Sequence, residues 1–139
     1  MRSHSESGQT TILVLGLALV AFAIAGLAVD GTRAFLLRRS LQNAADSAAV
    51  GAAGELDTSS LYSTGGRSVA LDPGAARAQA IELLSGRSLP ARASIRADAT
   101  GVTVVLRASL PTTFLGVVGV KAVPIAAEAR AEPFSGAAP

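Results

Sequence analysis

One apolar run dominates the first part of the chain. Residues 12–29 read ILVLGLALVAFAIAGLAV, so each of these positions is apolar or glycine. With Thr10 and Thr11 the run has about 20 residues, which gives an α-helix of roughly 30 Å, the thickness of the hydrocarbon core of a bilayer. The core helix of a small soluble domain would keep a polar face. The pattern therefore predicts a transmembrane helix over residues 10–30, preceded by a short tail over residues 1–9.

A cleavable secretory signal is the alternative interpretation of this run. Such a signal has a shorter apolar region that follows positive charge and ends in a small-x-small cleavage site. The triplet at residues 23–25 (AIA) has this form but lies within the run, and Arg2 before the run is offset by Glu6. We therefore expect an uncleaved signal anchor, which makes the chain a single-pass protein of the cell membrane.

The helical pattern continues after the run with smaller side chains. Residues 31–56 contain no proline, and apolar residues recur there at intervals of three and four, which places them on one face of a helix. The members of this face are Leu37, Leu41, Ala44, Ala48 and Ala52. Because small residues four apart let another backbone approach closely, the pattern predicts an amphipathic stalk with a helix-contact face for a homo- or hetero-oligomer. A general bias of the composition toward alanine is the alternative explanation.

Polar loops and short elements make up the rest of the chain. Residues 57–71 are rich in serine, threonine and glycine and predict a loop. Asp72 and Pro73 are typical of a helix start, because aspartate caps the first turn and proline fits it. Residues 111–119 predict a short helix or a hydrophobic loop that one of its two threonines caps.

Three strands are expected after the helix that begins at Asp72. They occupy residues 93–98, 102–110 and 121–131, which are rich in β-branched side chains or alternate between apolar and polar ones. Residues 72–132 are therefore expected to form a small domain of one helix on a roughly three-stranded antiparallel sheet, and residues 133–139 a disordered tail. The fold class is α+β. Because so small a domain has a thin core, we expect it to lean on a partner, on the stalk or on a membrane surface.

The composition argues against catalysis. The chain has no cysteine, and His4 is its only histidine. A thiol nucleophile and a cysteine-bearing metal site are therefore impossible, and a Ser–His–Asp triad would have to recruit His4 from the tail. No glycine-rich phosphate loop, GxSxG motif or spaced carboxylate pair is present. We expect that the protein is not an enzyme and that it has no catalytic, cofactor-binding or metal-binding residues and no cofactor.

The charges change the picture mainly at the end of the apolar run. The chain has 12 basic and 10 acidic residues, and the basic ones are neither clustered nor interleaved with aromatics, so we expect no nucleic acid as a partner. Arg33, Arg38 and Arg39 follow the run closely, and the positive-inside rule alone would keep the C-terminal side in the cytoplasm. Asp30 at the end of the run has two interpretations, a functional charge at the membrane edge or simply the first residue that reaches water, and we expect the second.

The residues around the run resemble those of a known family. Gly8 and Gln9 precede the run, Asp30 ends it, and the block LQNAADSAA follows at residues 41–49 with Gln42, Asn43 and Asp46. In these positions the chain resembles the N-terminal module of TadE/TadG-like pilus-assembly proteins of bacterial Tad (Flp pilus) systems. Prepilin-type processing needs glutamate at the fifth position after the glycine, and Leu13 stands there. The chain is therefore more similar to a short TadG-like member.

The resemblance implies a role, partners and a topology. It implies a non-catalytic accessory component of a Tad pilus-assembly or secretion system, with the membrane and other Tad proteins or pilin as partners. It also implies a cytoplasmic N-terminus and an extracytoplasmic C-terminal domain. Since domains of this length can translocate despite nearby charge, we expect that topology in spite of the arginines. The alternative is a secreted or membrane-anchored extracytoplasmic binding domain unrelated to pili.

Overall fold

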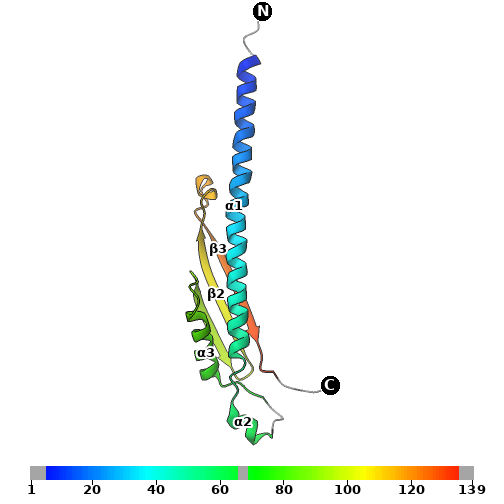
Figure 1. The fold of residues 1–139 in the computed structure, drawn as a ribbon, viewed down its shortest axis with the longest axis vertical. Coiled ribbons are helices and arrows are strands. Elements are labelled where there is room, and N and C mark those ends of the chain that lie inside the picture. Colours follow the sequence, from blue (N-terminus) through cyan, green and yellow to red (C-terminus); the bar gives the residue numbers. More distant parts are fainter. Residues whose placement is uncertain (1–5, 66–68, 135–139) are drawn as a thin grey trace, which may run out of the picture. The chain divides into compact units, whose positions relative to one another are not determined.

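The computed structural model describes residues 6–65 and 69–134. Its elements, in chain order, are α1 (Glu6–Ala52), α2 (Thr58–Ser63), α3 (Pro73–Ser85), β1 (Arg92–Asp98), β2 (Gly101–Pro111), the 3-10 helix η1 (Leu115–Val118) and β3 (Ala122–Ala131) (Figure 1). The expected α+β fold is confirmed: a long apolar helix precedes a small domain with a helix and a three-stranded sheet.

Both expected tails lie partly outside the described residues. Residues 1–5 of the N-terminal tail and residues 135–139 of the C-terminal tail are not among them. Residues 6–9, which the sequence assigns to the tail, form the first turn of α1. The helical pattern therefore begins before the apolar run.

The contacts within the chain define two compact units. The loop unit consists of the described residues of Met1–Phe35 and Leu110–Val123, and the sheet unit of those of Leu36–Ser109 and Pro124–Pro139. α1 belongs to the loop unit in its first part and to the sheet unit in its second. β2 and β3 likewise run from one unit into the other.

One face of the antiparallel sheet holds the core of the sheet unit. The strand order is β1-β2-β3, and in the β1–β2 hairpin Ile95 lies opposite Val104. Side chains on this face are buried at alternate positions along β2 and β3, as the period of two in a strand requires. The buried members are Val102, Val104, Leu106, Ile125, Ala127 and Ala129.

The second part of α1 supplies the other side of this core. Leu41, Ala44, Ala48 and Ala52 are all buried within the chain, and so are Ala45 and Ala49. Of the three supports considered for the small domain, its own stalk is therefore the one that the structure uses. Alanine suits this position because it lets the helix backbone lie close to its neighbour.

α3 packs against β1 and completes the cover of the sheet (Figure 1). It begins as expected: the Asp72 carboxylate caps it by accepting hydrogen bonds from the N–H groups of Gly74 and Ala75. Leu83 of α3 reaches α1 at Gly51, where a Cβ atom would lie 2.5 Å from the Leu83 Cδ1. The two helices therefore meet through a small residue.

A short helix stands where the sequence predicts only a loop. Residues 57–71 contain α2, whose first turn is capped by Asp57 through hydrogen bonds from the backbone N–H and the hydroxyl of Ser59. Leu56, just before this segment, and Leu71, its last residue, form an isolated antiparallel bridge. The hydrogen bond from the Ser59 side chain is the main cause of a lowered pKa of the Asp57 carboxyl. Aspartate before a helical turn is the local signal that the loop prediction overlooked.

Candidate functional site

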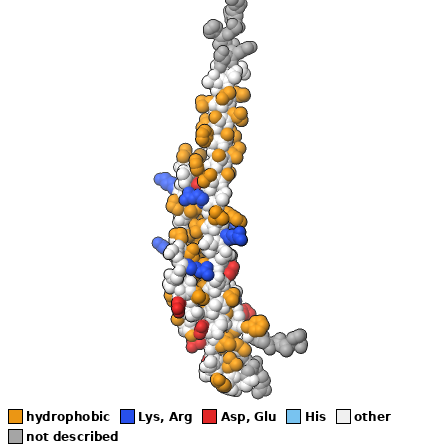
Figure 2. Space-filling model, in the orientation of Figure 1, with side chains coloured by type: hydrophobic (Ala, Val, Ile, Leu, Met, Phe, Trp, Pro, Cys, Tyr) orange, Lys and Arg blue, Asp and Glu red, His pale blue; other side chains and the backbone are white. Residues whose placement is uncertain are grey.

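The first part of α1 carries large apolar side chains that point outward. Among the described residues, α1 is the one helix long and apolar enough to cross a membrane. Its large hydrophobic residues between Ile12 and Leu27 are all exposed, and Phe22 exposes 73 % of its surface. Figure 2 shows hydrophobic and uncharged side chains over the visible face of this part of the helix. Contiguous exposed apolar surface on this scale marks contact with a membrane or a partner.

A loop between β2 and β3 folds back against this part of α1. It comprises residues 112–121 and contains η1, which lies beside α1 (Figure 1). The loop is closed by a hydrogen bond from the Thr112 N–H to the Lys121 carbonyl (3.1 Å) and by one from the Val120 N–H to the Leu115 carbonyl (3.0 Å). Gly119 has a φ of 95°, a conformation that favours glycine.

The Asp30 carboxylate holds the start of this loop. Its Oδ1 accepts a hydrogen bond from the Thr113 N–H (3.0 Å), and its Oδ2 accepts from the N–H groups of Phe114 (2.9 Å) and Leu115 (2.8 Å). Asp30 is only 2 % exposed. Among the described residues, it is the one polar or charged residue that is buried. The expectation that Asp30 is the first residue to reach water is therefore wrong. The carboxylate instead caps the turn that leads into η1, a role that the sequence assigns to a threonine.

Arg33 completes the polar part of this junction. It lies one helical turn after Asp30, and its Nη1 is 3.8 Å from the Asp30 Oδ1. The same nitrogen donates a hydrogen bond to the Thr113 Oγ1 (2.8 Å). Three backbone donors and one guanidinium thus compensate the charge of one buried carboxylate.

Gly26 allows the loop to approach α1 closely. A Cβ atom at this position would lie 2.5 Å from the Phe114 Cβ and 2.8 Å from its Cγ. These atoms are the stem of the phenylalanine side chain and cannot move without the loop backbone. Glycine at residue 26 is therefore a requirement of the contact between Phe114 and the helix.

An apolar cavity of about 260 Å³ lies between η1 and the helix. It contains no charged side chain, and η1 contributes Val117 and Val118, which expose 88 % and 74 % of their surface. The residues that line it are Leu19, Phe22, Ala23, Leu27, Phe114, Leu115, Val117 and Val118. Loop and helix thus form one continuous apolar surface.

The remaining residues of the family motif take different positions. Gln42 bridges α1 to β3, because its Nε2 donates hydrogen bonds to the Asp46 Oδ1 (2.9 Å) and to the Glu128 carbonyl (3.0 Å). Gly8, Gln9 and Asn43 lie at the exposed surface of α1. The structure thus brings Gln42 and Asp46 together in the sheet unit, while Asp30 serves the loop unit.

The predicted helix-contact face is covered by the chain itself. Leu41, Ala44, Ala48 and Ala52 have no appreciable exposure, and Leu37 is half-buried. In this structure the face packs within the sheet unit and is not open to a partner.

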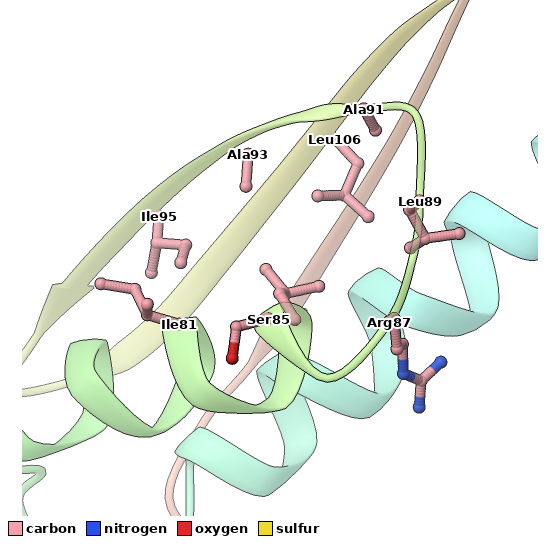
Figure 3. Close-up of a pocket in the computed structure, with 9 residues that line it drawn as sticks. Ile81, Ser85, Arg87, Leu89, Ala91, Ala93, Ile95 and Leu106 are labelled. Carbon is pink, nitrogen blue, oxygen red and sulfur yellow. The ribbon is translucent and has the colours of Figure 1, made fainter.

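A second cavity, of about 240 Å³, lies between α3 and the sheet. Figure 3 shows Ile81, Ile95 and Leu106 directed toward this space, while the guanidinium of Arg87 points away from it. The Ser85 hydroxyl donates a hydrogen bond to the Glu82 carbonyl (2.8 Å). The cavity thus offers apolar surface and no convergent polar groups, and it is small for a ligand site. In the part of the chain that is described, no three His, Asp or Glu side chains gather as a metal site would require.

These features define a class of protein: among the described residues, one helix is long and apolar enough to cross a membrane, and a small α+β domain packs on the second part of that helix. Residues 8–55 match the Tad family model, described as putative Flp pilus-assembly TadE/G-like. The match covers about a third of the chain and confirms the resemblance seen in the residues around the apolar run. It does not separate TadE-like from TadG-like members, so the likeness to a short TadG-like member stays a prediction. No curated protein and no solved structure matches the chain.

Proposed function

We propose that this protein is a non-catalytic, membrane-anchored component of a Tad/Flp-type pilus-assembly or secretion system. The match of residues 8–55 to the TadE/G-like family model is the observation that carries the proposal. The matched segment contains the whole apolar run and the alanine-rich part of α1. The exposed apolar surface of residues 12–29 supports anchoring, since water is a poor solvent for it.

We propose further that α1 crosses the membrane once, with the sheet unit outside the cytoplasm. The family resemblance supports this topology, and the arginines after the run oppose it. Long loops and domains translocate largely regardless of nearby charge, so the family argument has more weight.

Partner contacts in this proposal involve surfaces that the chain leaves uncovered. The alanine face of α1 is occupied by the sheet, whereas Phe35, Leu36 and Val50 on the same helix are exposed. Other helices of the assembly contact the large apolar residues of the run within the membrane and these three residues beyond it. The role is structural, through helix–helix and domain contacts.

Single-cysteine cross-linking tests this proposal in cells, because the chain has no cysteine of its own. In a strain that lacks the native gene, Val50→Cys is expected to cross-link to a Tad protein and to restore pili. Ala48→Cys is the matched control, since it lies on the buried face of the same helix and is expected to remain unlinked. Normal piliation without this protein, together with no cross-link from either variant, would contradict the role.

Two further measurements test the topology and the anchor. In intact spheroplasts, protease is expected to digest the sheet unit, and protection of that unit would reverse the proposed orientation. Mass spectrometry of the mature protein is expected to show an intact anchor. A mature chain that starts at Gly26 would instead favour a secreted binding domain, because cleavage there removes most of the apolar run.

A further inference from the structure

We propose that the loop between β2 and β3 is a second membrane-contacting element, which inserts Val117 and Val118 into the bilayer beside α1. The inference rests on the membrane anchoring proposed above and adds a site that the apolar helix alone does not imply. The occupant of this surface is lipid.

The position of the loop along α1 is the first argument. Phe114 of the loop lies against α1 at Gly26, and the cavity between loop and helix is lined on the helix side by residues from Leu19 to Leu27, which belong to the predicted span. Leu19 precedes Asp30 by 11 residues, which corresponds to about 16 Å along the helix axis. A helix that places residues 10–30 across a bilayer therefore places η1 below the membrane surface as well.

The side chains of the loop are the second argument. Residues 114–120 read FLGVVGV, so the tip contains no polar side chain. Val117 and Val118 are almost fully exposed in the chain alone, and they continue the exposed apolar surface of the helix. Lys121 and Arg33 flank the tip, where their charged ends can reach the headgroups while the tip lies deeper.

The backbone of the loop is the third and independent argument. Non-helical backbone is tolerated at membrane depth only where its polar groups are satisfied within the protein. Asp30 accepts three N–H groups at the start of the loop, at Thr113, Phe114 and Leu115. Further along, the N–H groups of Val117, Gly119 and Val120 donate to carbonyls of the same loop. The protein itself thus satisfies these donors, as backbone at membrane depth requires.

Tryptophan fluorescence tests the insertion, because the chain has no tryptophan. The full-length protein is reconstituted in vesicles of phosphatidylethanolamine and phosphatidylglycerol, with and without bromine on the acyl chains. Val117→Trp is expected to show blue-shifted emission and quenching by the brominated lipid comparable to that of Phe22→Trp. Ser94→Trp, on the outward face of β1, is the matched control and is expected to be quenched much less.

The outcomes separate the two proposals. Quenching of Phe22→Trp without quenching of Val117→Trp would leave the anchor intact and overturn the insertion. Absence of quenching in both variants would overturn the anchor and the insertion together. Blue-shifted emission of Val117→Trp without bromine quenching would show that protein, such as a second copy of the chain, covers the loop, and would also overturn the insertion.

A second variant tests the positioning role of Asp30. In Asp30→Ala combined with Val117→Trp, the loop loses the acceptor of three backbone N–H groups, so bromine quenching of the tryptophan is expected to fall. Quenching of Phe22→Trp in the same background is expected to stay unchanged. Equal quenching of Val117→Trp with and without Asp30 would overturn the role of the carboxylate.

Discussion

The two parts of α1 are one continuous helix with opposite surroundings. Residues 12–29 carry large side chains that face outward, whereas the face of residues 41–52 that is buried against the chain's own sheet consists of alanines and Leu41. Both parts present an apolar surface, so the hydrophobicity of that surface alone does not distinguish them. Side-chain size does: bulky groups suit contact with lipid, while alanine lets the helix backbone approach the sheet.

The same comparison extends to what each part does for its unit. The second part of α1 completes a core, so its residues are expected to control stability. The first part offers a surface. Within it, Asp30 and Gly26 make the contacts with the β2–β3 loop that we expect a substitution to disrupt. Substitutions along α1 can test this division.

Leu41→Ala is expected to have the largest effect. Leu41 is fully buried in the sheet unit, and removing a buried leucine side chain lowers the free energy of unfolding by about 3 kcal/mol. The matched control is Leu36→Ala on the same helix, where 57 % of the leucine surface is exposed, and its loss is expected to stay below about 0.5 kcal/mol. Thermal unfolding of the full chain in detergent, followed by circular dichroism, measures both. Equal losses would contradict the division of α1 into two surfaces.

Ala48→Leu is expected to destabilise the protein by overpacking. The alanine lies at the buried interface of α1, and extra methylene groups in a packed core cost about 2 kcal/mol. Val50→Leu, at an exposed position of the same helix, is expected to change stability very little. If Ala48→Leu kept its stability but lost assembly into pili, the alanine face would contact a partner rather than the sheet.

Much of this architecture follows from local sequence patterns. The apolar run predicts the first part of α1, and the pair Asp72–Pro73 predicts the start of α3 to the residue. The alternation of side chains predicts the hairpin of β1 and β2 within one residue at each end. These features depend on neighbours in sequence, so a local pattern contains the information.

The features that the sequence did not predict depend on distant contacts. The small residues of α1 indicate that a backbone lies close, but not whether it belongs to a partner or to the same chain. Asp30 accepts a hydrogen bond from Thr113, 83 residues later in the chain, and no local pattern predicts that contact. The sequence FLGVVGV shows that the loop is apolar, but it does not show that a carboxylate of the helix accepts the N–H groups at its start.

Substitution of two glycines in α1 by alanine is expected to change the stability by a smaller amount. A Cβ atom at Gly26 would meet the stem of Phe114, whereas one at Gly51 would meet only the movable tip of Leu83. Gly51→Ala is therefore expected to be neutral or to gain up to about 1 kcal/mol of helix propensity. Gly26→Ala is expected to displace the loop at a cost of about 1 kcal/mol or more, beyond that gain. Faster amide exchange at Thr113, Phe114 and Leu115 in Gly26→Ala, but not in Gly51→Ala, would confirm the contact between Phe114 and the helix. Equal exchange in both variants would contradict it.

The smallest expected effect is a response of the sheet unit to acid, at the turn of the β1–β2 hairpin. The Asp98 Oδ1 accepts hydrogen bonds from the Thr100 hydroxyl (2.6 Å) and from the N–H groups of Thr100 (2.7 Å) and Gly101 (3.0 Å). These bonds, led by that of the Thr100 side chain, lower the pKa of the Asp98 carboxyl. Because the pKa is lower in the folded state, the turn is stabilised above the unfolded pKa of about 3.9, and this contribution disappears as the pH falls further.

The second part of α1 has no share in this response, because its buried face consists of alanines and Leu41, which do not titrate. Acid is therefore expected to shift the NMR signals of the Thr100 and Gly101 amides below about pH 4 and to leave the amides of the buried alanines unchanged. In Asp98→Asn the shift at the turn should vanish, since the amide keeps an acceptor oxygen but does not ionise. A concerted change of the Ala44 and Ala48 amides over the same pH range would instead show that α1 and the hairpin open together, and the alanine interface would then be weaker than its burial indicates.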